Sequence, residues 1–337
     1  MQLFNNHFTK FLMLASVIMG CTSCSAKSST EPSAGNRSDE RHNTAKANLQ
    51  EIQMTKPVPN AYFKPAKQKG SVEKLEYDSK DYTKNSKPAT HKVAFVYLPH
   101  NYDASKQYDI VYLIHGWTGV AEEYFEAADS SLKNLFDNMI ERGEIKPFIA
   151  VSPTWDKDNR AKDWGESVAE IAVFYNEYEN ELIPAVEGKY STFAKSTDHA
   201  GIVASRAHRA FGGFSLGSVT TWYIFENRFD LQKYFLPMSG DSWHIEMFGG
   251  HYEPEATAAY LATVVNSSKF KDGFHVYHAV GTSDSRFYQT HNQALACKKL
   301  PEFPPERYSY HQKDGGHHDL NSVFEFCYNA LPEFFGK

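Results

Sequence analysis

A serine stands between two glycines in the stretch FGGFSLGSVTTW, residues 211–222. The run before it, HRAFGGFS at 208–215, has the composition of a β-strand, and residues 216–228 have helical spacing. Because glycine lets the backbone turn sharply, Gly213 and Gly217 predict a tight strand-to-helix corner that exposes the hydroxyl of Ser215. A structural Gly-Ser turn without a chemical role is the alternative interpretation.

Apolar runs alternate with segments of helical spacing along the rest of the chain. The predicted strands are at residues 92–99, 108–116, 147–154, 208–215, 234–240, 274–282 and 307–315. The predicted helices are at residues 129–142, 165–190, 216–228, 286–299 and 320–335, and we expect Pro184 to kink the second of them. This order predicts an α/β fold with a doubly wound, mostly parallel sheet flanked by helices. Ligand sites in such sheets lie at the carboxyl ends of the strands.

The N-terminus has the pattern of an export signal. Lys10 precedes an apolar run at residues 11–20, which is too short to span a bilayer and is followed at once by Cys21. This pattern is typical of a bacterial lipoprotein signal at residues 1–20, with lipid attached to the Cys21 thiol; a secretory signal cut between residues 23 and 26 is the alternative. Residues 21–64 predict a flexible tether, and residues 65–337 one folded domain. We therefore expect an exported lipoprotein, in the periplasm or on the cell surface, that meets the membrane only through its lipid anchor.

Composition narrows the classes of partner. The net charge is -6 and the chain has no long basic run, which argues against nucleic acid as a ligand. Aromatic residues make up 15% of the chain, a content that suits planar or sugar ligands. Cys297 and Cys327 lie in predicted helices and can pair only if the fold brings them together, and the sequence does not give the oligomeric state.

Three residues of complementary chemistry follow predicted strands. Ser215, Asp284 and His318 occur in the chain order of the α/β-hydrolase triad. A serine hydroxyl is a weak nucleophile, so a neighbouring imidazole must take its proton, and an acid must orient that imidazole. The combination predicts nucleophilic catalysis at an acyl carbon.

Two positions of this set have alternatives. Asp241 also follows a predicted strand, although Asp284 is favoured because its apolar strand breaks into Gly-Thr immediately before the acid. His317 and His318 are adjacent, so only one of them can face Ser215. The histidine doublet lacks a third ligand at suitable spacing, which argues against a metal site, and nothing in the sequence implies a cofactor.

The corner also predicts an oxyanion site. The N–H of Leu216, at the start of the following helix, is one expected donor, and the N–H of Trp117, after His115-Gly116, is the second. Each such donor stabilises a transition state by about 3–4 kcal/mol.

At these residues the chain resembles the feruloyl esterases of carbohydrate esterase family one, which belong to the esterase-D-like α/β-hydrolases. The resemblance covers about residues 70–337 and rests on YLPHNYD, LIHGWTG, ASRAHRAFGGFSLGS, SGDSW, GTSD and GGHHDLN. It implies Ser215 as nucleophile, Asp284 as acid and, by matching His-Asp-x-Asn, His318 as base. The family usually has a third glycine where this chain has His317, so His317 stays an alternative.

The resemblance implies cleavage of hydroxycinnamate esters, such as feruloyl groups on arabinoxylan. Four aromatic residues near strand ends are candidates to flank the phenolic ring: Trp117, Trp243, Phe287 and Tyr288. An acetylxylan-type or siderophore esterase on the same triad is the second interpretation. A non-catalytic carbohydrate-binding lipoprotein is the third.

Overall fold

The computed structural model of the chain describes residues 52–125, 130–156, 158 and 163–336. The predicted signal segment, Cys21 and most of the predicted tether lie outside these residues. None of the described helices is both long and apolar enough to cross a bilayer.

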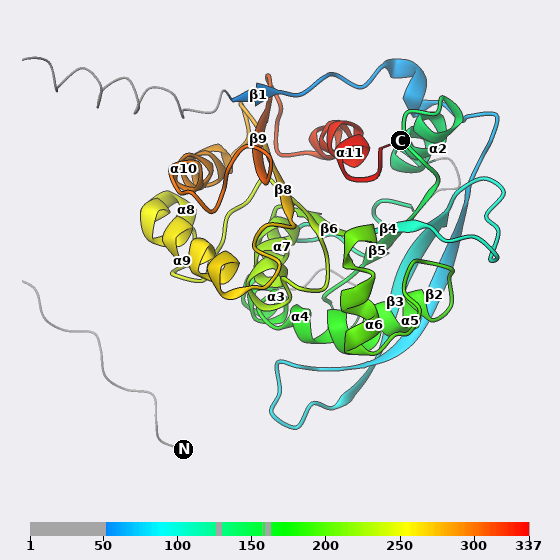
Figure 1. Ribbon diagram of the computed structural model, residues 1–337, viewed down its shortest axis with the longest axis horizontal. Helices are drawn as coiled ribbons and strands as arrows, with labels where there is room; N and C mark the ends of the chain where they lie inside the picture. The colour runs from blue at the N-terminus through cyan, green and yellow to red at the C-terminus, as the bar shows by residue number, and fades with distance from the viewer. Residues whose placement is uncertain (1–51, 126–129, 157, 159–162, 337) are drawn as a thin grey trace, which may run out of the picture. The chain divides into compact units, whose positions relative to one another are not determined.

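A nine-stranded sheet forms the centre of the folded unit, in the order β1-β9-β8-β7-β6-β4-β5-β3-β2 (Figure 1). The strands are β1 (Gln53–Met54), β2 (Ser71–Lys80), β3 (Ala89–Leu98), β4 (Asp109–Ile114), β5 (Phe148–Pro153), β6 (Arg209–Phe214), β7 (Tyr234–Met238), β8 (His275–Gly281) and β9 (Tyr308–Lys313). The pairs from β5 through β4, β6, β7, β8 and β9 to β1 are parallel, whereas β3 is antiparallel to β5 and to β2. The predicted mostly parallel α/β-hydrolase sheet is confirmed.

Helices cover both faces of this sheet. They are α2 (Ser131–Glu141), α3 (Trp164–Ile171), α4 (Phe174–Glu177), α5 (Ile183–Glu187), α6 (His199–Ala204), α7 (Leu216–Asn227), α8 (Gly249–Tyr252), α9 (Pro254–Ser267), α10 (Phe287–Cys297) and α11 (Leu320–Phe335), with short turns η1 (Asn60–Phe63), η2 (Tyr178–Leu182) and η3 (Arg206–His208). Figure 1 shows α2 and α11 on one side of the sheet, and α3, α4 and α7 on the other.

The two faces of β4 show how the core is divided. Ile110 and Tyr112 pack into the cluster that contains α3, α4, α7 and α10, whereas Val111 and Leu113 pack into the cluster of α2 and α11. Successive side chains of a strand point to opposite faces, so a strand covered on both sides is apolar throughout. This is why the central strands were visible in the sequence as continuous apolar runs.

The predicted helix at 165–190 is broken. Residues 164–187 form α3, α4, the π-type turn η2 and α5 rather than one kinked helix. The break falls at Ala172–Val173, between α3 and α4, whereas α4, η2 and α5 follow one another without interruption. Pro184 directly follows the π-type turn, an irregularity of the kind that accompanies a proline within a helix. The kink predicted at Pro184 stays a prediction.

The folded unit begins earlier in the chain than the boundary at residue 65 that composition predicted. β1 pairs with β9, and η1 buries Tyr62 to 5% exposure. The Asn138 amide donates to the carbonyls of Tyr62 and Lys64 at 3.3 and 2.9 Å. Residues 52–64 thus belong to the domain, because their few apolar side chains and their backbone groups find partners on α2 and β9.

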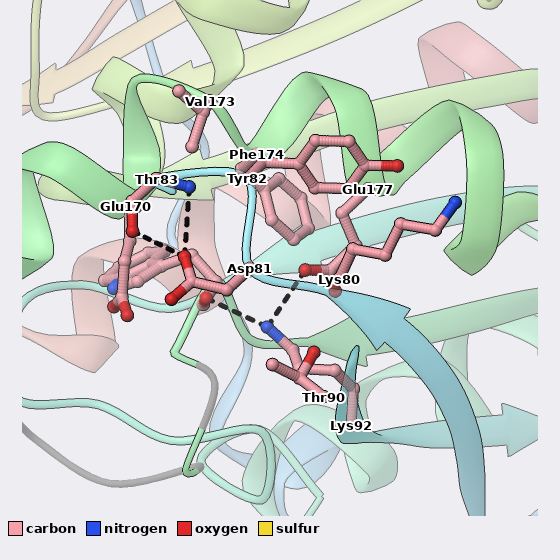
Figure 2. A pocket seen from close by; sticks show the side chains of 11 residues that line it. Lys80, Asp81, Tyr82, Thr83, Thr90, Lys92, Glu170, Val173, Phe174 and Glu177 are labelled. Carbon is pink, nitrogen blue, oxygen red and sulfur yellow. Dashed lines mark hydrogen bonds and ion pairs between the residues drawn. The ribbon is translucent and has the colours of Figure 1, made fainter. Parts of the chain in front are cut away.

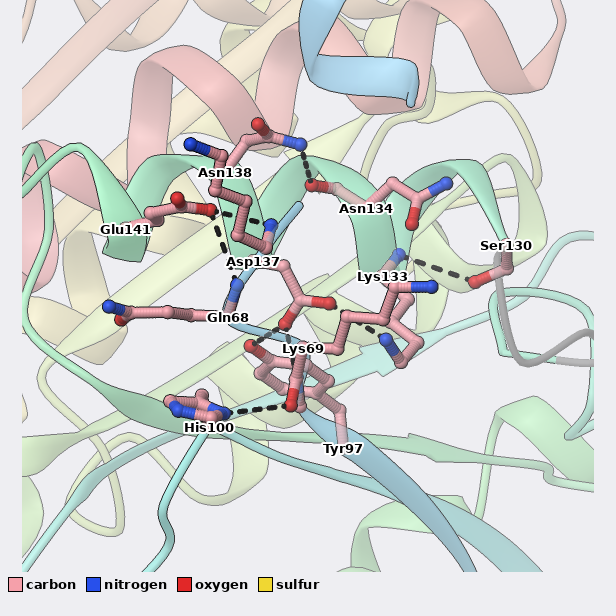
Figure 3. A network of polar contacts seen from close by, with 12 residues as sticks. Gln68, Lys69, Tyr97, His100, Ser130, Lys133, Asn134, Asp137, Asn138 and Glu141 are labelled. Carbon is pink, nitrogen blue, oxygen red and sulfur yellow. Dashed lines mark hydrogen bonds and ion pairs between the residues drawn. The ribbon is translucent and has the colours of Figure 1, made fainter. Parts of the chain in front are cut away.

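A polar network continues this attachment along α2 (Figure 3). Asp137 accepts hydrogen bonds from Gly70 N at 2.8 Å, Tyr97 Oη at 2.8 Å and Lys133 Nζ at 2.7 Å. The main-chain N–H of Gln68 donates to Glu141. The segment leading into β2 is therefore held at two successive turns of the helix.

Cys297 and Cys327 are both buried and are free thiols in this structure. Burial raises the pKa of each thiol to about 12. The disulfide that the sequence left open is absent between them.

Candidate active site

The serine corner lies between β6 and α7. Ser215 has φ 59° and ψ −116°, a conformation that side-chain-bearing residues rarely adopt. A Cβ added to Gly213 would lie 2.4 Å from the Gly217 carbonyl oxygen, and one added to Gly217 would lie 2.4 Å from the Ile114 oxygen. Any larger residue at either position would push the corner away from β4, so the glycines are what permits it.

An acid and a histidine from distant segments meet beside this corner. His318 Nδ1 lies 2.8 Å from Asp284 Oδ1, and the Asp284 side chain is fully buried. The imidazole ring packs on Phe214, the residue before Ser215, with ring centroids 4.4 Å apart. Since an ionised carboxylate only accepts hydrogen bonds, Nδ1 carries the proton and Nε2 keeps its lone pair. The histidine is thus oriented to act as a base through Nε2.

The alternative acid and base have other surroundings. Asp241 accepts from Trp243 Nε1 at 3.1 Å and from the Gly250 N–H at 2.8 Å, and burial raises its pKa to about 6. His317 is exposed, and its carbonyl accepts from Ser322 Oγ at 2.7 Å. The structure therefore pairs Asp284 with His318, and gives Asp241 the task of holding the 241–250 loop together.

The loop after β4 lies against the serine corner. A Cβ added to Gly116 would be 3.3 Å from the Ser215 Cβ. His115 Nδ1 lies 2.8 Å from the Gly116 oxygen and its Nε2 lies 2.8 Å from Thr154 Oγ1. Burial lowers the His115 pKa to about 4, so this imidazole is neutral at physiological pH. Trp117 follows directly, and Leu216 is the first residue of α7. That the N–H groups of these two residues form an oxyanion site stays a prediction.

A buried ion pair supports this loop from below. Lys92 Nζ lies 3.1 Å from Glu177 and donates to the Trp155 carbonyl at 2.9 Å (Figure 2). The Trp155 ring in turn packs on His115, with ring centroids 4.1 Å apart. Removing either partner would leave the other charge buried without a counterion, which destabilises the fold. Lys92 and Glu177 therefore support the loop after β4 only when both are present.

A small, partly open hollow lies beside Ser215. We call it the Ser215 hollow; its side-chain walls include Trp164, Asp241, Trp243, Phe248 and Arg286. Ring centroids of Trp164 and Trp243 are 5.9 Å apart, and those of Trp243 and Phe248 are 5.0 Å apart. The aromatic rings in these walls are suited to contact the faces of a planar, largely apolar group.

The predicted ring-binding residues divide into two groups. Trp243 lines the Ser215 hollow, and Trp117, 43% exposed, packs edge-on against Trp164 at 5.3 Å. Phe287 and Tyr288 are not among the lining residues: Phe287 stacks on His291, and Tyr288 is 66% exposed. That either of these rings flanks the substrate stays a prediction.

Sequence reasoning did not identify Trp164, Phe248 or Arg286. These residues come from the start of α3, from the turn before α8 and from the turn before α10. Their local sequence carries no motif, so only the tertiary fold brings them together. Among the described residues, no group of three His, Cys, Asp or Glu side chains gathers where it would hold a metal ion.

A strained serine corner beneath an Asp–His pair, at the carboxyl edge of a mostly parallel sheet, defines an α/β-hydrolase. The family model described as "Putative esterase" matches residues 87–325, and the chain belongs to this esterase family.

Relatives narrow the class further. The chain is 36% identical over 287 residues, 83% of its length, to endo-1,4-beta-xylanase Y of Acetivibrio thermocellus. Among solved structures, a mutant of the feruloyl esterase module from Clostridium thermocellum complexed with sinapinate is 34% identical with a TM-score of 0.72; the match covers 85% of this chain and 95% of that one. The CE1 ferulic acid esterase of Anaeromyces mucronatus, 19% identical with a TM-score of 0.61 over 85% of this chain and 99% of that one, shares the fold.

The chain spans only part of its curated relatives. It covers 24% of xylanase Y, and 20% of an endo-1,4-beta-xylanase/feruloyl esterase of Xylanibacter ruminicola, to which it is 28% identical over 45% of its own length.

Proposed function

We propose that this chain is a serine esterase that hydrolyses hydroxycinnamoyl esters, such as feruloyl groups on arabinoxylan, through an acyl-enzyme on Ser215. The observation that carries the proposal is the His318–Asp284 hydrogen bond beside the Ser215 corner. The feruloyl esterase module complexed with sinapinate supports the choice of acyl group, and the xylanase names of the curated relatives support the polysaccharide.

The first half of the reaction forms the acyl-enzyme. Ser215 Oγ attacks the ester carbonyl while His318 Nε2 takes the hydroxyl proton, and Asp284 stabilises the resulting imidazolium. The carbonyl oxygen becomes an oxyanion, to which the N–H groups of Leu216 and Trp117 donate. His318 then gives its proton to the sugar oxygen, which leaves as an alcohol.

The second half reverses these roles with water. His318 Nε2 takes a proton from water, the hydroxide attacks the acyl carbon, and Ser215 Oγ leaves with the proton returned by His318. The products are a hydroxycinnamic acid and the regenerated serine. The rings of Trp164, Trp243 and Phe248 flank the planar acyl group during both halves.

The test is release of ferulate from feruloylated arabinoxylan fragments, with methyl ferulate and acetylated xylan compared in parallel. The wild-type chain should release ferulate, and Ser215→Ala should lose at least about 10⁴-fold in kcat/KM. Ser283→Ala, which removes an exposed hydroxyl next to Asp284, is the matched control and should stay within about threefold. Deacetylation without ferulate release would favour the acetylxylan-type interpretation, and no ester hydrolysis at all would favour the carbohydrate-binding one.

We also propose that the chain is exported and lipidated on Cys21. The apolar run at 11–20 followed by that cysteine supports this. Metabolic labelling with a fatty-acid analogue should mark the wild-type chain and not Cys21→Ser. Equal labelling of both would contradict the proposal.

A further inference from the structure

Arg286 lies in the turn between Asp284 and α10, and its side chain lines the Ser215 hollow. Its main-chain N–H donates to Asp284 Oδ1 at 2.7 Å, on the same oxygen that meets His318. The start of the Arg286 side chain is therefore fixed relative to the proposed acid and base.

The guanidinium of Arg286 lacks a polar partner within the described part of the chain. Its recorded side-chain contact is the face of Phe248, 5.1 Å from the ring centroid. Asp241 lies near enough for the charge of Arg286 to lower its pKa, but no hydrogen bond or ion pair joins the two side chains among the described residues. A guanidinium has five N–H donors in one plane. Those of Arg286 are open to a ligand in the hollow.

The remaining walls favour an occupant that is flat and carries oxygen at its edge. Trp164, Trp243 and Phe248 supply ring surfaces, and Arg286 and Asp241 supply the charges among the described lining residues. Each Asp241 oxygen already accepts one N–H, whereas the guanidinium donors of Arg286 have no polar acceptor among the described residues. Arg286 is therefore the lining residue best able to donate to polar atoms of a ring held against these walls.

We propose that Arg286 determines the acyl specificity of this site by donating hydrogen bonds to the oxygen substituents of the hydroxycinnamoyl ring. This inference rests on the proposed function and adds to it the residue that recognises the oxygen substituents of the ring. A site built to hydrogen-bond a substrate oxygen discriminates against the analogue that lacks it, because the half-buried donor then loses its partner in the bound complex.

The experiment compares two methyl esters that differ only in their ring oxygens, methyl ferulate and methyl cinnamate, on three chains. Arg286→Met keeps the length of the side chain and removes every donor. Tyr252→Phe, which removes the hydroxyl of a residue that is 63% exposed and is not among the residues lining the hollow, is the matched control. We expect Arg286→Met to lose roughly 10- to 100-fold in kcat/KM on methyl ferulate and less than about threefold on methyl cinnamate. Tyr252→Phe should leave both unchanged.

The outcomes separate this inference from the proposed function. If the wild-type chain hydrolyses neither ester, the proposed function is wrong. If it hydrolyses methyl ferulate and Arg286→Met lowers both esters equally, or neither, the inference alone is wrong. If Arg286→Met loses activity on a feruloylated oligosaccharide but not on methyl ferulate, the guanidinium contacts the sugar rather than the ring. That result also overturns the inference. Should Arg286→Met fail to fold, judged by circular dichroism, Arg286→Leu also removes every donor and should give the same ratio.

Discussion

The Nδ1 atom of His318 lies 2.8 Å from Oδ1 of Asp284, although the two residues are 34 positions apart in the chain. β8 ends just before the acid, and the loop after β9 carries the histidine. Because β8 and β9 are parallel neighbours, their carboxyl ends bring both residues to one edge of the sheet.

The choice of acid is tested by paired amide substitutions. Asp284→Asn should lower kcat by about 10⁴-fold with little change in overall structure, because the neutral amide no longer selects the Nδ1–H tautomer. Asp241→Asn should act mainly on stability, since an amide NH₂ would meet the Trp243 or Gly250 donor. Steady-state kinetics and thermal melts of both variants check this. A catalytic loss larger in Asp241→Asn than in Asp284→Asn would refute the assignment.

The histidine doublet offers its own control. We expect His318→Ala to lose about 10³-fold or more in kcat, because no general base then faces Ser215. His317→Ala should stay within about threefold, since its side chain is exposed. The same ester assay measures both, and the reverse order of effects would make His317 the base.

Glu226, on α7, predicts a pH dependence of stability. Its side chain is buried, accepts from Ser242 Oγ at 2.5 Å, and has a pKa raised to about 8, chiefly by loss of solvent. His244 lies 3.8 Å away, but burial lowers its pKa, so it does not supply a charge at neutral pH. Between its ordinary pKa of 4.5 and about 8, the folded state holds a proton on Glu226 that the unfolded state releases.

The free energy of unfolding should therefore fall as pH rises through that window, by at most about 1.4 kcal/mol per pH unit. Glu226→Gln keeps an acceptor for Ser242 and does not titrate. Urea unfolding from pH 5 to pH 8 should show the wild-type chain losing stability relative to Glu226→Gln. Parallel curves for the two proteins would show that Glu226 is not protonated in the fold.

The N-terminal boundary is open to a direct test. A chain beginning at residue 65 lacks β1 and the buried ring of Tyr62, and should unfold several degrees below one beginning at residue 52. The loss of the Tyr62 side chain alone is worth about 2–4 kcal/mol. Differential scanning calorimetry compares the two, and Tyr62→Ala in the longer chain isolates the ring. Equal melting temperatures would show that residues 52–64 belong to the predicted tether and not to the folded domain.

The sequence predicted the strands that are buried on both faces, because their residues are almost all apolar. β4, β6 and β7 have apolar residues on both faces, so their composition alone marks them as strands. β2 was missed because it is an edge strand whose exposed residues are charged, and its first half has no apolar alternation. The break in the helix at 165–190 was missed because it falls at Ala172–Val173, where no glycine or proline marks the end of a helix.

The candidate site likewise has residues that the sequence predicted and residues that it did not. Ser215, Asp284 and His318 follow strands, so their meeting at one edge was predictable from strand order. The walls of the Ser215 hollow were not, since Trp164 and Phe248 reach it from segments whose path depends on tertiary packing. Phe287 and Tyr288 also follow a strand, yet neither is among the residues that line the hollow.

The serine corner is held by backbone contacts within the sheet, whereas the rings around the Ser215 hollow come from separate excursions of the chain. The residues proposed for catalysis and those proposed for acyl-group selection therefore lie on different segments of the chain. Replacing one of the ring-bearing segments, by evolution or by design, can change which acyl group is accepted and leave Ser215, Asp284 and His318 unaltered.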